Sequence, residues 1–354
     1  MKRQTVVERA LQKFVSARAG AGEPVPVGPR GFTAPMTMPW HVRTLILPIP
    51  AGERVRVIFA NLVVGRVGMA GFDDEPATSR PENECHLTVL ALGRNRPLCE
   101  AFVFDRRGSL REETGRGFGI DPGRFHYRAT GSWPKISSGL EIPEWGFRLD
   151  LETDCRAPVV WWSNTHPFYS HYSAFGRTRG TVEIDDRVQP IDEWISLEHG
   201  MGMNLRRWPG SPTLPASIFH YQLGALASGE VFALGCFSAL GIEVFRRGVL
   251  IAPGGSRHPI DCWRMEDADV VSVEDRCGDK LDVPRDFRMH ARSSSLSLDY
   301  DVETLAVPIA GTGRLTSSGA DISGKLCLKG DEEKDVSGSL YIEHLHRKGV
   351  PTVP

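Results

Sequence analysis

The stretch "GTVEIDDRVQPIDEWISLEHG", residues 180–200, decides the fold. Apolar and polar residues alternate on both sides of a polar turn, which is the pattern of two strands joined as a hairpin. A second stretch, "GKLCLKGDEEKDVSGSLYIEHLH" at residues 324–346, has the same order and also contains a Glu-His pair. The interval from the first glycine to that glutamate is 18 residues in one copy and 19 in the other. Two matched hairpins predict two homologous β-domains in tandem.

The rest of the chain supports an all-β fold. Short runs rich in β-branched and aromatic residues are separated by turn residues, among 37 glycines and 25 prolines in all. Many short strands favour barrels or curved sheets, because closing a sheet removes its unpaired edges. We expect a short N-terminal helix and linker at residues 1–30, a first β-domain at 31–208 and a second at 209–354, with a Pro/Gly-rich boundary between the two domains.

Composition narrows the class of protein. The 354 residues are 41% hydrophobic and 24% charged, and the net charge of −2 gives no electrostatic reason to expect nucleic acid as a partner. No apolar run approaches the length that spans a bilayer, and the N-terminus lacks the apolar run of a signal peptide. The seven cysteines include no CxxC pair, so we expect reduced thiols in a cytoplasmic protein. Peripheral membrane contact through the N-terminal helix stays open beside simple packing.

The adjacent residues Glu198 and His199 are the first candidates for catalysis, together with His166. On a strand, neighbouring side chains point to opposite faces, so only one member of the Glu-His pair can face a given interior. An inward Glu198 among apolar walls would be a general acid with a raised pKa, and an inward His199 would be a base or hydrogen-bond donor. The alternative is a structural role in fixing the turn that follows, which the repeat at Glu343-His344 favours.

Aromatic and polar residues near these candidates predict substrate contacts. Aromatic walls suit a polyene or a developing cation, and a tyrosine adds a hydroxyl donor to its ring. His220 and Gln222 share one face of the strand "FHYQL", either inside a cavity or on a solvent face. The predicted substrate-binding residues are Trp161, Trp162, Tyr169, Tyr172, His220 and Gln222. No metal-ligand motif, dinucleotide fingerprint or P-loop appears, so we expect no metal and no cofactor.

The tandem β layout, the stretch at residues 180–202 and the upstream "HPFYS" resemble the carotenoid 1,2-hydratase (hydroxyneurosporene synthase) group and related natural-product cyclases, which include Diels–Alderases. That resemblance implies two lipocalin-like domains and an apolar substrate such as a polyene or isoprenoid. The chain departs from the group where many members carry a "W-x-D-H" style element, because it reads Ser196-Leu197-Glu198-His199 there.

Three functions fit these features. The first is a cofactor-independent enzyme that hydrates or cyclises a C=C system of a hydrophobic isoprenoid, polyene or polyketide. The second is a non-catalytic carrier for a lipid or isoprenoid. The third is a structural module with a filled core that binds protein through its surface. A carrier would tolerate the loss of Glu198 and His166, whereas an enzyme would lose turnover and keep its fold.

Overall fold

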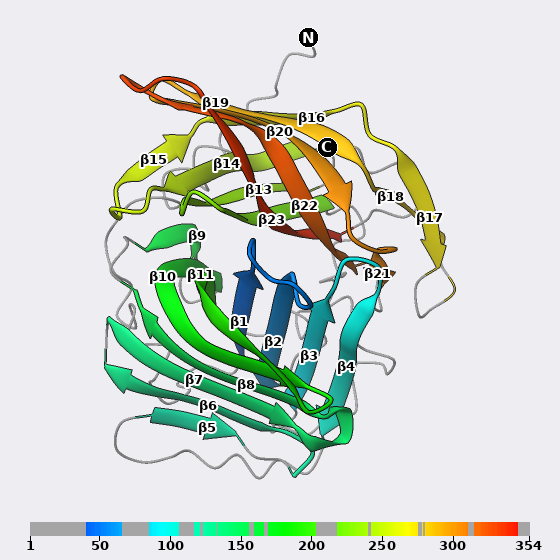
Figure 1. Cartoon of the computed structure of the whole chain (residues 1–354). Coiled ribbons are helices and arrows are strands. Elements are labelled where there is room, and N and C mark those ends of the chain that lie inside the picture. The colour runs from blue at the N-terminus through cyan, green and yellow to red at the C-terminus, as the bar shows by residue number, and fades with distance from the viewer. Residues whose placement is uncertain are drawn as a thin grey trace. The chain divides into compact units, whose positions relative to one another are not determined.

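The computed structural model describes residues 40–65, 85–105, 117–120, 123–132, 134–155, 159–165, 169–202, 218–239, 242–274, 278, 280–310 and 315–345. The chain separates into two compact units, one with the strands β1–β11 and the other with β12–β23 (Figure 1). The prediction of two tandem all-β, lipocalin-like domains is confirmed. The predicted N-terminal helix and linker at residues 1–30 lie outside the described residues, and the exact domain boundaries stay a prediction.

The first unit is one eleven-stranded antiparallel sheet with the order β4-β3-β2-β1-β11-β10-β8-β7-β6-β5, and β9 pairs with β10. The short 3-10 helix η2 (Pro143–Trp145) joins β7 to β8. Its strands are β1 (Trp40–Pro48), β2 (Val57–Gly65), β3 (Cys85–Leu92), β4 (Pro97–Asp105), β5 (Gly117–Ile120), β6 (His126–Ser132), β7 (Lys135–Ile142), β8 (Phe147–Asp154), β9 (Val160–Thr165), β10 (Tyr169–Ile184) and β11 (Arg187–Gly202).

The hairpin predicted at residues 180–200 forms the centre of this sheet. Its two turn residues, Asp185 and Asp186, have φ angles of 51° and 60°. Aspartate tolerates this left-handed conformation, and two such residues in a row match the right-handed twist of a hairpin. The strands β10 and β11 are long and strongly bent, and they connect the β1–β4 part of the sheet with the β5–β8 part (Figure 1).

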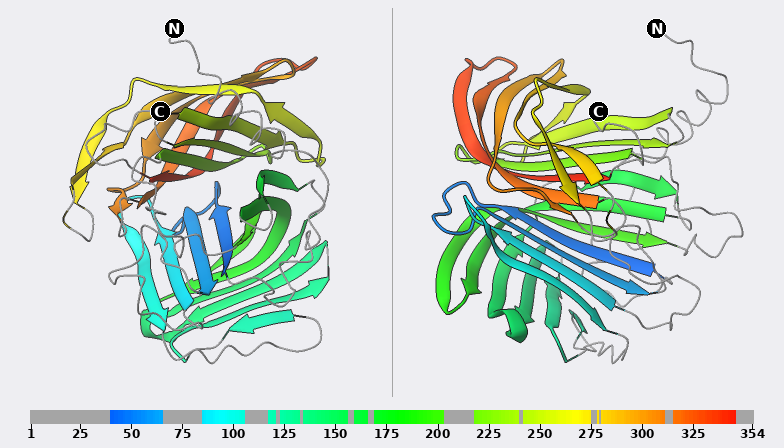
Figure 2. Two further views of the ribbon diagram at one scale, coloured as in Figure 1. Left: turned by 180° about the vertical axis from the view of Figure 1, so that it is seen from behind. Right: turned by 90° about the vertical axis from the view of Figure 1, so that its right-hand side faces the viewer.

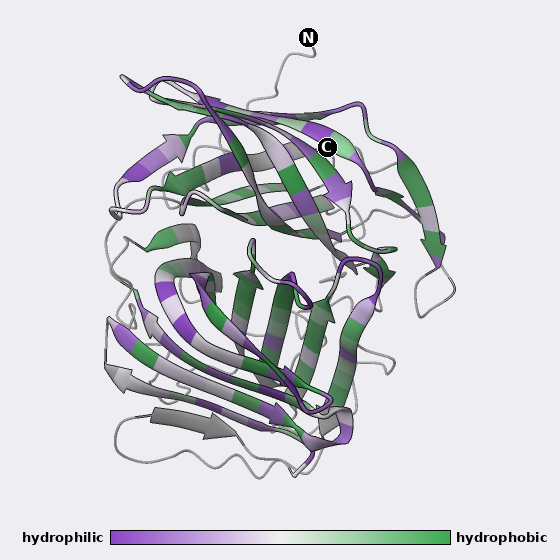
Figure 3. Cartoon of the chain, in the orientation of Figure 1, coloured by the Kyte–Doolittle hydropathy of each residue, from purple (hydrophilic) through white to green (hydrophobic). Residues whose placement is uncertain are grey.

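The concave side of the first sheet holds its apolar core. Alternate residues of each strand point inward, as the two-residue period requires. They come from both parts of the sheet, for example Leu45 and Val89 from one part and Leu140 and Leu149 from the other. Strands β1–β3 carry apolar residues along most of their length (Figure 3). Many side chains on the opposite side of β1–β3 are buried as well, which explains why these strands read as continuous apolar runs.

The second unit repeats the same order around its own hairpin. A ten-stranded sheet runs β15-β14-β13-β12-β23-β22-β20-β19-β16, with β21 paired to β22, and β17 pairs with β18 separately. These strands have the colours from yellow-green to red in Figure 2. The strands are β12 (Ile218–Leu226), β13 (Val231–Ala239), β14 (Ile242–Ile251), β15 (Arg257–Ile260), β16 (Cys262–Glu266), β17 (Val270–Glu274), β18 (Lys280–Pro284), β19 (Phe287–Ser293), β20 (Leu296–Thr304), β21 (Ile309–Ala310), β22 (Leu315–Leu328) and β23 (Lys334–Leu345). The order β2-β1-β11-β10-β8 therefore corresponds to β13-β12-β23-β22-β20.

The two matched stretches both begin with a glycine, and the structure requires glycine at both positions for the same reason. A Cβ atom on Gly180 would lie 1.9 Å from the backbone oxygen of Asp150 on β8. A Cβ atom on Gly324 would lie 2.0 Å from the backbone oxygen of Asp299 on β20. Real side chains never approach backbone so closely, so each position admits only glycine unless the neighbouring strand moves.

We therefore expect Gly180→Ala to destabilise the protein, because the added methyl group overpacks against backbone that cannot rotate away. The free energy of unfolding should fall by about 1–3 kcal/mol, measured by urea denaturation. Gly254→Ala is the matched control, since a Cβ atom there meets nothing within 4 Å. Equal stability of the two variants would contradict the close approach at Gly180.

Candidate functional site

The hairpin β10–β11 places Glu198 and His199 on opposite faces of the first sheet. Its register pairs Ser173 with Glu198 and Tyr172 with His199, and paired residues share a face. Tyr172 belongs to the apolar core cluster, so His199 faces the core and Glu198 faces the other side. Both side chains are buried. The orientation of this pair, which the sequence left open, follows from the register.

The carboxylate of Glu198 is held in place by hydroxyl groups. Its Oε1 accepts a hydrogen bond from Ser173 Oγ at 2.9 Å and a longer one from Ser196 Oγ at 3.4 Å. Trp162 Nε1 donates to Ser173 Oγ at 2.6 Å. Because an indole N–H can only donate, Ser173 accepts from Trp162 and directs its own proton to Glu198. One edge of the carboxylate is thus fixed, and the Oε2 atom faces away from the serines.

His171 lies at that second oxygen. Its Nε2 atom is 3.2 Å from Glu198 Oε2, and the pair forms a histidine–carboxylate dyad. The Glu198 side chain is 7% exposed and the His171 side chain is 20% exposed. A carboxylate in this position keeps the hydrogen on Nε2 and leaves Nδ1 as the basic nitrogen of the neutral ring. The imidazole is therefore the more accessible partner, and the carboxylate orients it.

A polar row continues from Glu198 across the same face of the sheet. The register places Thr44 beside Glu198, Asn61 beside Thr44 and Thr88 beside Asn61. Thr44 Oγ1 donates to Asn61 Oδ1 at 3.0 Å. All four side chains are buried. Burying a polar side chain costs free energy unless it is hydrogen-bonded. A row of four such side chains therefore distinguishes this face of the sheet from the apolar core face.

The core-facing side of the same hairpin carries a second polar group. Tyr172 Oη lies 3.2 Å from His199 Nδ1, and the two rings meet edge to face with centroids 5.6 Å apart. Arg43 pairs with His199 in the register of β1 and β11. Burial raises the pKa of the Tyr172 hydroxyl, which Arg43 opposes only in part. Tyr172 therefore stays protonated and can donate to His199.

His220 and Gln222 lie in the second unit, on the core-facing side of β12. His220 Nδ1 is 2.9 Å from His344 Nδ1, and Gln222 Nε2 is 2.8 Å from His220 Nε2. Tyr300 Oη donates to Gln222 Oε1 at 2.5 Å. The four side chains form one buried hydrogen-bonded chain, and the Trp263 ring lies 5.2 Å from that of His220. The sequence left open whether His220 and Gln222 face the interior or the solvent. Both side chains face the interior of the second unit.

Of the remaining predicted site residues, the structure describes the side chain of Trp162 but not those of His166, Trp161 and Tyr169. Trp162 is buried and bonded to the Glu198 network, on strand β9. His166 lies outside the described residues, and the side chains of Trp161 and Tyr169 are not described. A catalytic or binding role for each predicted residue stays a prediction.

His171 and Ser173 were missed by the sequence analysis, although the hairpin contained the signal for both. Counting pairs back from the Asp185-Asp186 turn leads from the pair Ile184 and Arg187 to the pair Ser173 and Glu198. That count places the histidine of "YSHYS" diagonally beside the glutamate. The contact of Trp162 with Ser173 could not be predicted in this way, because the pairing of β9 with β10 contains an irregularity.

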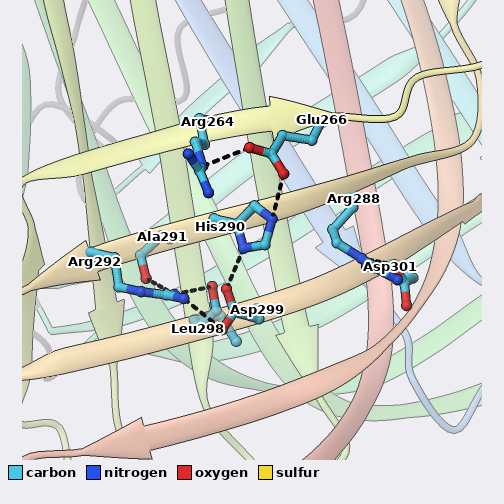
Figure 4. Close-up of polar contacts among 9 residues, drawn as sticks. All are labelled: Arg264, Glu266, Arg288, His290, Ala291, Arg292, Leu298, Asp299 and Asp301. Atoms are coloured by element: carbon cyan, nitrogen blue, oxygen red, sulfur yellow. Dashed lines mark hydrogen bonds and ion pairs between the residues drawn. The ribbon is translucent and has the colours of Figure 1, made fainter.

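A more extended polar cluster lies on β16, β19 and β20 of the second unit (Figure 4). His290 sits between Asp299 Oδ1 at 2.6 Å and Glu266 Oε2 at 3.2 Å. Arg292 and Arg264 bind the same two carboxylates. Exposed pairs of this kind contribute little and are screened by salt. The opposite charges in this cluster satisfy one another, so it is a surface network and a weaker candidate for catalysis than the dyad.

Cysteine chemistry is not favoured at the buried thiols. Burial raises the pKa of Cys99 and of Cys155 to about 12 and that of Cys236 to about 11. A thiol that stays protonated at neutral pH is a poor nucleophile. Within the described residues, no group of three His, Cys, Asp or Glu side chains is arranged to hold a metal ion. In the same part of the chain, no helix is long and apolar enough to cross a membrane.

Comparisons with known proteins agree with this architecture. The model of a family of unknown function (DUF6670) matches residues 128–314. A Nitrosomonas europaea protein provisionally named AttH is 10% identical, with a TM-score of 0.56 over 93% of this chain and 99% of that one. Kievitone hydratase from Nectria haematococca is 12% identical, with a TM-score of 0.54 over 93% and 96%. CghA, solved with Sch210972, is 12% identical, with a TM-score of 0.55 over 87% and 89%.

At these identities the solved structures show a shared fold, and they cover nearly the whole of both chains. The resemblance to a hydratase-containing group, which the sequence predicted, is confirmed at the level of the fold. A comparison of the sequence with curated proteins finds no match.

Proposed function

We propose that this chain, which belongs to the family of unknown function DUF6670, is a cofactor-independent enzyme that acts on a hydrophobic small molecule. The substrate class is an isoprenoid, polyene or polyketide, and the reaction is the hydration or cyclisation of a C=C system. His171 is the acid–base group in this proposal, and Glu198 is its positioning residue.

One observation carries the proposal, namely the geometry of the dyad. The Glu198 carboxylate is fixed by Ser173 on one oxygen and meets His171 Nε2 at 3.2 Å on the other. An imidazole held by a carboxylate is the usual way to orient a group that takes and returns protons near neutral pH. The low exposure of the Glu198 side chain strengthens its contact with His171, because an electrostatic contact is stronger where the local dielectric constant is low.

The same dyad serves both reactions. In a hydration, the His171 imidazolium gives a proton to one alkene carbon and water adds to the other carbon. The added water then loses a proton, so that the sum is alkene plus water giving alcohol. In a cyclisation, the imidazolium lends a hydrogen bond or a proton that is returned at the end, and substrate and product are isomers. Neither route needs an electron acceptor or donor.

The names of the structural neighbours favour this class of reaction. One neighbour is a hydratase, and another holds the small molecule Sch210972 in its crystal structure. Both share the two-unit β fold over nearly their whole length. Fold similarity alone does not determine an activity. The proposed reaction therefore rests on the dyad, and the neighbours indicate which class of molecule to test as substrate.

The test begins with the ligand. Native mass spectrometry of the purified chain, followed by solvent extraction, should reveal a bound polyene, terpenoid or polyketide, and incubation with that compound should convert it. In water labelled with oxygen-18, a hydration adds the heavy isotope to the product and a cyclisation does not. A compound that binds and is returned unchanged would indicate the carrier instead. A protein that binds no compound from a panel of apolar ligands would refute both.

A further inference from the structure

The interior of the first unit contains a buried cation among hydroxyl groups. Arg43 lies on the core-facing side of β1, in line with Leu45 and beside Leu62 of β2, and it is 4% exposed. A guanidinium stays charged in proteins and is rarely fully buried unless it is paired. This cation faces the opposite side of the sheet from the Glu198–His171 dyad.

The groups near Arg43 are hydrogen-bond donors. Tyr127 packs against the core cluster from β6, and burial raises its pKa against the effect of Arg43. Burial likewise raises the pKa of Tyr172, so both hydroxyls keep their protons at neutral pH. If Tyr172 donates to His199 Nδ1, the neutral ring carries its hydrogen on Nε2. Guanidinium, phenol and imidazole N–H groups are together suited to a negatively charged oxygen.

The walls next to this donor group are apolar. Leu45, Leu62, Leu197, Ala174 and Leu140 are all buried members of the same core cluster. The interior of an eight-stranded barrel is either filled by side chains or holds one small ligand, and this curled sheet has eleven strands. A ligand that matches both features has an acidic oxygen at one end and an apolar chain at the other.

We propose that the interior of the first unit binds the carboxylate or enolate of an amphipathic organic acid, with Arg43 as the anion-binding residue and Tyr127 and His199 as further donors. The acidic head group contacts the guanidinium, and the apolar chain lies against Leu45, Leu62 and Leu197 of the core cluster. The site is separate from the dyad, so it can exist whether or not the dyad is catalytic.

The experiment compares an acid with the alcohol of equal chain length. Nile red, a neutral dye, is loaded into the full-length protein and displaced with dodecanoate or dodecan-1-ol below their aggregation limits. We expect dodecanoate to bind at least about tenfold more tightly than the alcohol, as a charge-assisted hydrogen bond implies. In Arg43→Met that preference should vanish while the affinity for dodecanol is kept. Arg179→Met removes an arginine that is 78% exposed in the same unit and should keep the wild-type preference.

The proposal is overturned if the wild type binds acid and alcohol equally, if it binds neither, or if Arg43→Met keeps the preference. Should Arg43→Met fail to fold by circular dichroism, Arg43→Lys and Tyr127→Phe decide, because either must reduce the preference. Wild-type preference in both would refute the site. His171→Gln separates the two proposals: it should lose turnover and keep the preference for dodecanoate.

Discussion

His171→Gln is expected to lower kcat by about 10²–10⁴-fold on the extracted substrate, which is the usual contribution of a positioned acid–base group. Glutamine keeps a polar side chain of similar reach, but it cannot take up or release a proton near neutral pH. The fold should be unchanged, because the side chain is 20% exposed and lies outside the apolar core. Steady-state kinetics with circular dichroism as a folding check measure both effects.

The surface network supplies the matched control for this experiment. His290 also contacts carboxylate oxygens, those of Asp299 and Glu266, but it lies in the second unit (Figure 4). His290→Gln should leave kcat unchanged. Equal kcat values for His171→Gln and the wild type would refute the role of the dyad.

Glu198 should behave as a positioning residue. Glu198→Gln keeps an oxygen that can accept from Ser173 and removes the charge that holds His171. We expect kcat to fall less than in His171→Gln and KM to stay nearly the same, because the carboxylate does not itself contact substrate in this proposal. A rise in KM with kcat unchanged would show instead that Glu198 binds the substrate directly.

The sequence predicted the fold well because its signals were local. Alternation and a polar turn are visible within residues 180–200, and the matched stretch at residues 324–346 indicated duplication. The structure adds the reason for the matching glycines, since both meet a backbone oxygen of the neighbouring strand. That reason lies in β8 and β20, because the close approach depends on which residue of the neighbouring strand pairs beside each glycine, and the sequence does not give this pairing.

The site was predicted only in part because it depends on register and not on composition. Glu198 and Trp162 stood out as unusual residues, whereas His171 became visible only through its position across the hairpin. The burial of Arg43 could not be predicted, because a single arginine in the strand "WHVRTLILP" is equally compatible with a side chain exposed to solvent. His220 and Gln222 lie in the second unit, where β12 pairs with β23, and their predicted role as substrate contacts stays a prediction.

Breaking the buried hydrogen-bonded chain of side chains in the second unit should strongly lower the free energy of unfolding. Gln222 bridges Tyr300 Oη and His220 Nε2, and all three side chains are buried. Gln222→Leu preserves the approximate size of the side chain and removes both hydrogen bonds. Each buried polar group that loses its partner costs about 1–3 kcal/mol, so the free energy of unfolding should fall by about 3 kcal/mol. Urea denaturation followed by fluorescence, to which the nearby Trp263 contributes, measures the change.

A double variant separates the loss of hydrogen bonds from a simple change of packing. In Gln222→Leu with Tyr300→Phe, the hydroxyl that would have lost its partner is itself absent. If unpaired polar groups cause the loss, the double variant should be less destabilised than the sum of the two single variants. If the two effects add, the cost comes from packing around the leucine. The first result would show that the buried hydrogen bond between Tyr300 and Gln222 stabilises this core beyond the packing of the two side chains.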